Sequence, residues 1–161
     1  MGIPAHPLVV HAAVVFVPLL ALLAIAYAFV PFARPHIRWV LGLLALATPI
    51  IALTAKLSGD AFLNRLQSRG RVTPEFLPTL EEHRRFGTLT LYATIVLALL
   101  TLALIYFVAP RVAAAHAAGE GGSSRVMPLA LGVLTVVAAG VSLYYVVRTG
   151  DSGAKAVWTG S

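Results

Sequence analysis

The sequence predicts an all-α fold in which four transmembrane helices form one antiparallel (up-down-up-down) bundle. Hydrophobic residues make up 59% of the chain and charged residues only 11%, against about 25% charged residues in soluble domains. Because one charged side chain at the centre of a bilayer costs about 2.5–3.5 kcal/mol, long stretches without charge indicate membrane spans. Four stretches contain no Asp, Glu, Lys or Arg: residues 1–33, 39–55, 86–110 and 126–147.

The first two helices are delimited by prolines and basic residues. The first helix is expected over about residues 7–30, where Pro31 ends it, and Pro18 in its interior predicts a kink. After a short basic turn, Trp39 stands where an aromatic residue is expected at the membrane interface. The second helix is therefore expected over about residues 38–57, with an interior proline of its own.

A polar stretch separates the second helix from the third. Residues 58–79 are expected to form a loop that holds a short helix lying on the membrane surface, with Gly70 as its stop. Thr79 followed by Glu82 matches a capping box, in which each side chain satisfies a backbone N–H at the start of a helix. The third helix is therefore expected over about residues 80–108.

The last helix follows a segment of small residues. Residues 112–125 are rich in Ala, Gly and Ser, which predicts a flexible loop. The fourth helix is expected over about residues 126–148, where Gly150 ends it, leaving a tail over residues 149–161. The whole chain, residues 1–161, is then a single transmembrane domain, because short connections make sequential helices antiparallel neighbours.

Composition also limits the chemistry that this chain can perform. It contains no cysteine, which excludes disulfides, thiolate zinc sites, iron–sulfur ligation by this chain and covalent c-type haem attachment. Its basic residues flank apolar blocks instead of clustering on one element, so the net charge of +6 does not indicate nucleic-acid binding. We expect a membrane protein that is not an enzyme on its own.

Two histidines form the leading candidate site. His11 lies one turn inside the first helix among apolar residues, and an ionisable side chain at that depth is a functional-site hypothesis. His83 is expected at a comparable depth on the same membrane face, and Gly87, one turn further along, leaves space for a flat group. Two imidazoles on non-sequential helices of a bundle can bind the iron of a b-type haem axially. The haem propionates would pair with arginines of this face: Arg84, Arg85 and Arg148.

Other interpretations of the same residues stay open. His11 could bond a backbone carbonyl, such as one freed by Pro18, while His83 is hydrated at the interface. His6 precedes a proline, which favours an extended conformation and a role in capping the first helix. A metal site built from histidines and carboxylates would draw on five residues: His6, His11, Asp60, Glu82 and His83.

Three segments resemble a known family. They are His6-Pro7-Leu8-Val9-Val10-His11, Glu82-His83 and Gly150-Asp151-Ser152-Gly153-Ala154-Lys155-Ala156-Val157-Trp158. Together they make the whole chain similar to the bacterial membrane proteins grouped as domain of unknown function 2231. The resemblance implies four spans in the bacterial inner membrane. It also implies redox work, because some relatives are joined to Rieske-type iron–sulfur domains.

The leading hypothesis is a b-type haem protein that passes electrons to or from a membrane redox complex, a quinone or an iron–sulfur protein. The alternative is a non-catalytic structural or assembly subunit of a larger membrane complex. A transporter is less favoured, because no acidic residue lies at mid-membrane. Eight Lys and Arg are expected on the side of the termini and four on the other, which favours cytoplasmic termini. The first helix alone has no Lys or Arg before it and two after it, which argues for the reverse orientation.

Overall fold

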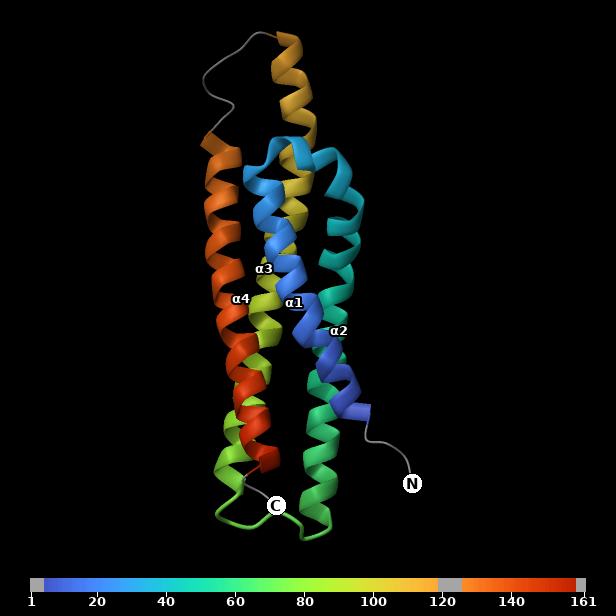
Figure 1. Ribbon diagram of the computed structural model, residues 1–161, viewed down its shortest axis with the longest axis vertical. Helices are drawn as coiled ribbons and strands as arrows, with labels where there is room; N and C mark the ends of the chain where they lie inside the picture. The colour runs from blue at the N-terminus through green and yellow to red at the C-terminus, as the bar shows by residue number, and fades with distance from the viewer. Residues whose placement is uncertain (1–4, 119–125, 159–161) are drawn as a thin grey trace.

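The computed structural model describes residues 5–118 and 126–158, and every element in them is helical (Figure 1). All four long helices have the length and apolar character needed to cross a membrane. The chain is therefore a multi-pass membrane protein in contact with lipid, and the predicted four-helix transmembrane bundle is confirmed. The elements are α1 (Ala5–Phe29), the 3-10 turn η1 (Pro31–Ala33), α2 (Arg34–Ser68), α3 (Leu77–Ala118) and α4 (Val126–Trp158).

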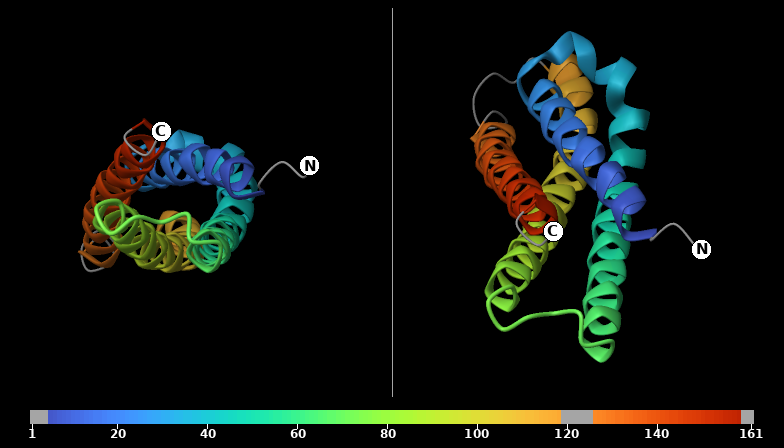
Figure 2. Two further views of the ribbon diagram at one scale, coloured as in Figure 1. Left: turned by 90° about the horizontal axis from the view of Figure 1, so that it is seen from below. Right: turned by 60° about the horizontal axis from the view of Figure 1, so that its bottom comes forward.

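The helices run up, down, up and down, so that the described starts of α1 and α3 and the ends of α2 and α4 share one end of the bundle (Figure 1). Seen from below, they form a ring in which α1 and α3 each pack against both α2 and α4 (Figure 2). Small side chains such as Ala24, Ala45 and Ala139 are buried where the helices meet, which lets their backbones approach closely. Larger core residues fill the centre of the ring: Leu20, Tyr27, Leu41, Leu97 and Leu104.

The second helix is longer than expected, because the helix predicted to lie on the membrane surface is its continuation. α2 runs without interruption to Ser68. Gly70 then adopts a φ of +63°, and the N–H groups of Gly70 and Arg71 donate to the carbonyls of Gln67 and Leu66, each at 3.0 Å. This pattern of a left-handed glycine with two reversed hydrogen bonds ends helices efficiently. The predicted stop at Gly70 is confirmed, and the separate surface helix is wrong.

The third helix also exceeds its predicted bounds at both ends. α3 begins at Leu77, so Thr79 lies inside the helix and does not cap it. The carbonyl of Thr73 instead accepts hydrogen bonds from the N–H groups of Phe76 and Leu77, each at 3.1 Å. At its other end α3 continues to Ala118, so the first part of the predicted loop is helical. Residues 119–125, the rest of that loop, lie outside the described residues.

The fourth helix does not end at Gly150. It continues to Trp158, which makes most of the predicted tail its last turns; residues 159–161 lie outside the described residues. A glycine inside a helix costs about 1 kcal/mol relative to alanine, and contacts with α3 offset that cost. Ser152, in the extension, is 3% exposed and hydrogen-bonds His83. The stop signal was local, whereas the contact that overrides it joins residues far apart in the sequence.

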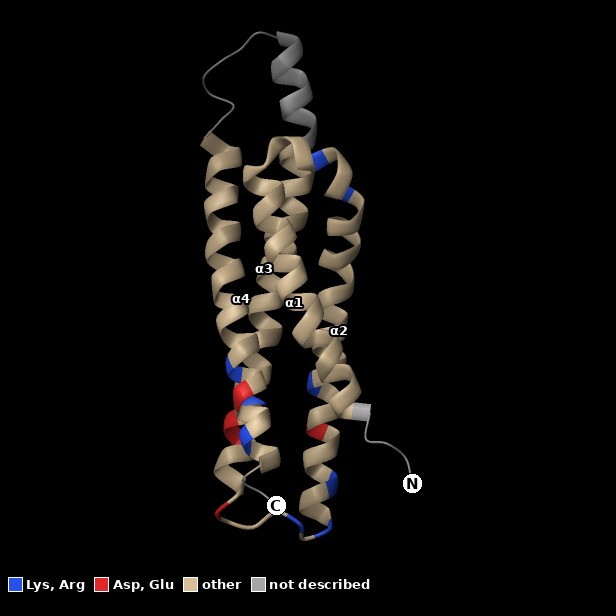
Figure 3. Ribbon diagram, viewed as in Figure 1, with Lys and Arg blue, Asp and Glu red and all other residues tan. Residues whose placement is uncertain are grey.

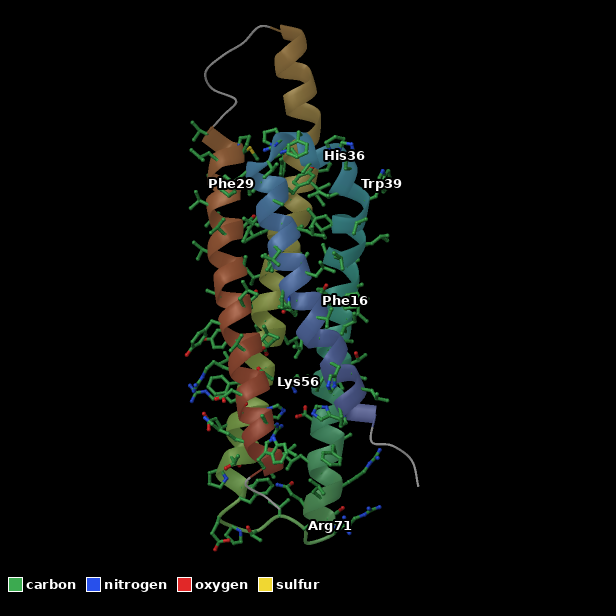
Figure 4. The ribbon with its side chains drawn as sticks, viewed as in Figure 1. Phe16, Phe29, His36, Trp39, Lys56 and Arg71 are labelled. Carbon is green, nitrogen blue, oxygen red and sulfur yellow. The ribbon has the colours of Figure 1, made fainter. Side chains whose placement is uncertain are left out.

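Charge locates the membrane along the bundle. On α2, 17 residues without charge separate Arg38 from Lys56, which at about 1.5 Å per residue span about 26 Å, close to a hydrocarbon core of about 30 Å. Figure 3 shows the charged residues of the described chain at the two ends of the bundle, with an uncharged zone between them. Trp39, labelled in Figure 4, is 78% exposed at the upper boundary, as expected for an interfacial aromatic. Below Lys56, α2 extends out of the hydrocarbon layer.

Candidate functional site

A cavity of about 110 Å³ lies at the lower boundary of the membrane, between the start of α1, the lower parts of α2 and α4 and the start of α3. By a comparable measure, a single buried water needs roughly 10–15 Å³. The walls are mostly apolar and include Val10, Ala13, Ala52, Leu63 and Val146. The polar side chains that line it are His6, Lys56, Asp60, His83, Arg84, Thr90 and Thr149. Apolar walls with a few charged and imidazole groups are the usual composition of a cofactor or ligand site.

His6 forms the α1 side of this site. It lies in the first turn of α1, so the predicted extended conformation is wrong, and its half-buried ring packs against α2. The ring Nδ1 donates to the carbonyl oxygen of Ala55 at 3.2 Å and lies 3.0 Å from Oγ of Ser58. The ring also stacks on Phe62, with centroids 6.3 Å apart and planes 18° from parallel. These contacts with α2 outweigh the local preference that the following proline imposes.

His83 forms the α3 side of the site in the same way. Its Nδ1 donates to the carbonyl oxygen of Thr149 and lies close to Oγ of Ser152, both at 3.1 Å, so α4 holds the ring. The His6 and His83 rings approach each other with centroids 6.2 Å apart and planes at 77°. Among the described residues, Nε2 of neither ring has a hydrogen-bond partner. Two imidazoles from different hairpins therefore meet at one end of the bundle.

His11 is not part of this pair. Its side chain is exposed, and its Nδ1 donates to the carbonyl oxygen of Pro7, one turn earlier, at 2.6 Å. At about 100° per residue, His11 lies about 140° around the helix from His6, whereas Val10 and Ala13 share the cavity face with His6. The expected meeting of His11 with His83 does not form. The alternative of a bond to a backbone carbonyl is the one observed, although the acceptor is not a carbonyl freed by Pro18.

An ion cluster lies at the mouth of the cavity. Asp60 accepts hydrogen bonds from Nζ of Lys56 at 2.5 Å and from Nε of Arg84 at 3.0 Å, so the three groups carry a net charge of about +1. Arg84 and Gly87 line the cavity, as the sequence analysis expected of them. Figure 4 shows Lys56 in the lower part of the bundle, far from Trp39 and His36.

The other two arginines expected at the site lie elsewhere. The guanidinium of Arg148 is 4.9 Å from the centroid of the Phe86 ring and pairs with Glu82 (3.7 Å) and Asp151 (3.9 Å). Neither Arg148 nor the exposed Arg85 lines the cavity. The five-residue metal site is not assembled either, because within residues 5–118 and 126–158 no three His, Cys, Asp or Glu side chains converge.

Sequence reasoning considered His6 only for capping and for the five-residue metal site, and it assigned no role in the site to Lys56 or to the serines and glycines that contact the two histidines. A signal for the serines and glycines was present. The dipeptide Ser-Gly occurs in the chain only at positions 58–59 and 152–153, and these are the positions that hold the two imidazoles. The link between these dipeptides and the histidines depends on α2 and α4 extending past the membrane. The sequence did not predict those extensions.

Comparison with known proteins adds one match. A family model described as "Predicted membrane protein (DUF2231)" matches residues 2–161, nearly the whole chain. No curated protein and no solved structure matches.

Proposed function

The chain belongs to the DUF2231 family of predicted membrane proteins, and from that premise we propose that it binds a b-type haem between His6 and His83 and transfers electrons. One observation carries the proposal: two imidazoles on different hairpins meet edge-on, with centroids 6.2 Å apart and planes at 77°. Two imidazoles bound to opposite sides of one metal ion, with metal–nitrogen bonds of about 2.0–2.1 Å, have centroids about 6 Å apart. With this separation, His6 and His83 would be the two residues that hold the iron of a bound haem.

The small number of donors favours haem over a bare metal ion. A structural or catalytic zinc site takes three or four protein ligands, whereas the described residues offer two imidazoles and no third converging ligand. A haem brings four nitrogens of its own and needs the protein only for its axial positions. The donor set of this site thus matches what a haem requires.

The surroundings of the two rings support the same ligand. Metal-bound histidines commonly donate their second ring N–H to a backbone carbonyl, which fixes the ring and makes the ligating nitrogen more basic. Both rings have this contact, with Ala55 and Thr149 respectively. The cavity walls are apolar, and Lys56 and Arg84 at its mouth are placed to pair with acidic propionates. Lys56 would therefore pair with a propionate in place of Arg85 and Arg148, which do not line the cavity.

The level of the site in the membrane limits which electron carriers could reach a haem bound there. A bound haem would supply a one-electron couple at its iron. His6 lies beside Gly59, about one turn below the last uncharged stretch of α2, so the site is near the membrane surface. A quinone in the bilayer or an iron–sulfur protein at the surface of a bacterial inner membrane could approach it there.

The absorption spectrum of the purified protein in detergent tests this proposal. After haem is added and unbound haem is removed, we expect a Soret band, and on reduction with dithionite the α-band of a low-spin haem with two histidine ligands. His6→Ala and His83→Ala should each lose or shift these bands, and His11→Ala should leave them unchanged. A protein without a Soret band under these conditions would rule out haem, and a colourless protein that co-purifies with other membrane subunits would favour an assembly role.

A further inference from the structure

The two hairpins of the bundle hold their histidines in the same way. In the α1–α2 hairpin, His6 contacts Ser58 and the carbonyl three residues before it; in the α3–α4 hairpin, His83 contacts Ser152 and the carbonyl three residues before that serine. The four distances agree closely, at 3.2 and 3.0 Å in one hairpin and 3.1 and 3.1 Å in the other. Each histidine is at the start of its helix, and each serine is near the end of the next.

The hydrogen bonds of the serines determine which ring nitrogen carries the proton. Oγ of Ser58 donates to the carbonyl of Ala55 at 2.8 Å, and Oγ of Ser152 donates to the carbonyl of Thr149 at 3.1 Å. The hydroxyl proton is therefore used, and the serine oxygen can only accept from the imidazole. Because a carbonyl oxygen also only accepts, both neighbours of Nδ1 require Nδ1 to be the donor. In the neutral ring, Nε2 then keeps its lone pair.

A glycine follows each serine and gives the ring its space. A Cβ built on Gly59 would lie 2.9 Å from Cε1 of His6, and one built on Gly153 would lie 2.9 Å from Cε1 of His83. In both hairpins the next nearest ring atom is Nδ1, at 3.3 Å, and Nε2 is further away. The Nδ1–Cε1 edge of each ring therefore faces the glycine, and a larger residue would displace the ring.

From these contacts we infer that Ser58-Gly59 and Ser152-Gly153 are equivalent positioning pairs, one in each hairpin, which hold His6 and His83 with Nδ1 protonated and Nε2 free to bind a metal. The metal part of this inference rests on the proposed function; the tautomer part concerns the haem-free protein. The serines and glycines do not contact the haem themselves; they affect its binding only by positioning the two imidazoles.

Ring-nitrogen NMR of the full-length, haem-free protein in detergent tests the tautomer. With 15N-labelled histidine at a pH where the rings are neutral, His6 and His83 should both show a protonated Nδ1 and an unprotonated Nε2. Their signals are assigned from His6→Ala and His83→Ala. Ser58→Ala should raise the Nε2–H fraction of His6 alone by about two- to tenfold, the effect of losing one hydrogen bond. Ser152→Ala should do the same to His83 alone.

Ser68→Ala is the matched control for the serine variants. Ser68 is also on α2, and its hydroxyl also donates to the carbonyl three residues earlier, at 3.1 Å, but it is exposed and hydrogen-bonds no histidine among the described residues. It should leave both ring signals unchanged. Protonated Nε2 in the unmodified protein, or the same response to Ser58→Ala and Ser68→Ala, would overturn the inference.

Haem titration separates this inference from the proposed function. Ser58→Ala and Ser152→Ala should each weaken haem binding by about 10–100-fold, the usual cost of losing a partner of a metal ligand. Gly59→Ala should weaken it further, whereas Gly42→Ala, on the same helix with open space around its Cβ, should not. If the tautomers are as expected but no haem binds, the proposed function fails alone. If haem binds to Ser58→Ala, Ser152→Ala and Gly59→Ala as tightly as to the unmodified protein, the positioning role fails alone.

Discussion

Replacing His6 by alanine tests which histidine of α1 belongs to the site. The His6 side chain bonds Ala55 and Ser58 on α2, at 3.2 and 3.0 Å. The one Nδ1–H is shared by the two oxygens, so it counts as a single neutral hydrogen bond, and His6→Ala should lower the free energy of unfolding by about 0.5–1.5 kcal/mol. In a chain of this size 1 kcal/mol corresponds to about 2–4 °C, which gives a fall in Tm of about 1–6 °C.

His11→Ala is the control for this experiment. His11 is exposed and bonds only a carbonyl of its own helix, so its replacement should change the free energy of unfolding by less than about 0.5 kcal/mol. Thermal unfolding of the haem-free protein in detergent, followed by circular dichroism, measures both variants. The structural reasoning is refuted if His11→Ala lowers Tm by as much as His6→Ala does, or if His6→Ala leaves Tm unchanged.

Three further predictions concern single side chains, measured by the same unfolding assay. The hydroxyl of Thr94 is fully buried and has no hydrogen-bond partner in the described part of the chain, so Thr94→Val should stabilise the protein by about 1 kcal/mol. Thr101→Val loses a 2.7 Å bond and should not stabilise it. Destabilisation by Thr94→Val would contradict this prediction. Arg34 donates to two carbonyls at the end of α1, at 2.8 and 2.7 Å, so Arg34→Ala should cost about 2 kcal/mol and more than Arg38→Ala. Asp60→Asn removes the partner of two cations and should cost about 1 kcal/mol, less at high salt; a cost that is independent of salt would argue against the ion pairs.

The spans were predictable from the sequence because a membrane excludes charge so strongly. The ends of the helices were less predictable, and two glycines show why. Gly70 ends α2 because it takes a left-handed conformation beyond the last packed turn. Gly150 carries the same local signal, yet the turns of α4 that follow it are held by His83 of α3. Such a contact joins residues that are 69 positions apart, and no local pattern reports it.

The site was predictable in part for a similar reason. Antiparallel order correctly placed His83, Arg84 and Gly87 at one end of the bundle. The choice between His6 and His11 depends on the rotation of α1 about its axis. Because α1 is apolar on every side, its sequence contains no amphipathic stripe that would reveal which face meets the cavity. Because a residue before a proline disfavours the helical conformation, the sequence favoured His11 over His6. In the structure His6 lines the cavity and His11 does not.

The way each histidine is braced by the following helix has a consequence for biogenesis. The hydrogen bonds of the His6 ring, to Ala55 and Ser58, lie within the α1–α2 hairpin. This hairpin can therefore insert into the bilayer and position His6 before the second hairpin has been synthesised. His83 gains its brace only when residues 149–153 have emerged. A chain truncated after residue 148 would still contain four membrane-spanning helices. Its His83 ring would lack the contacts with Thr149 and Ser152 that fix its orientation. The brace of His83 is thus completed only by the turns of α4 that lie beyond the membrane, after α4 itself has crossed.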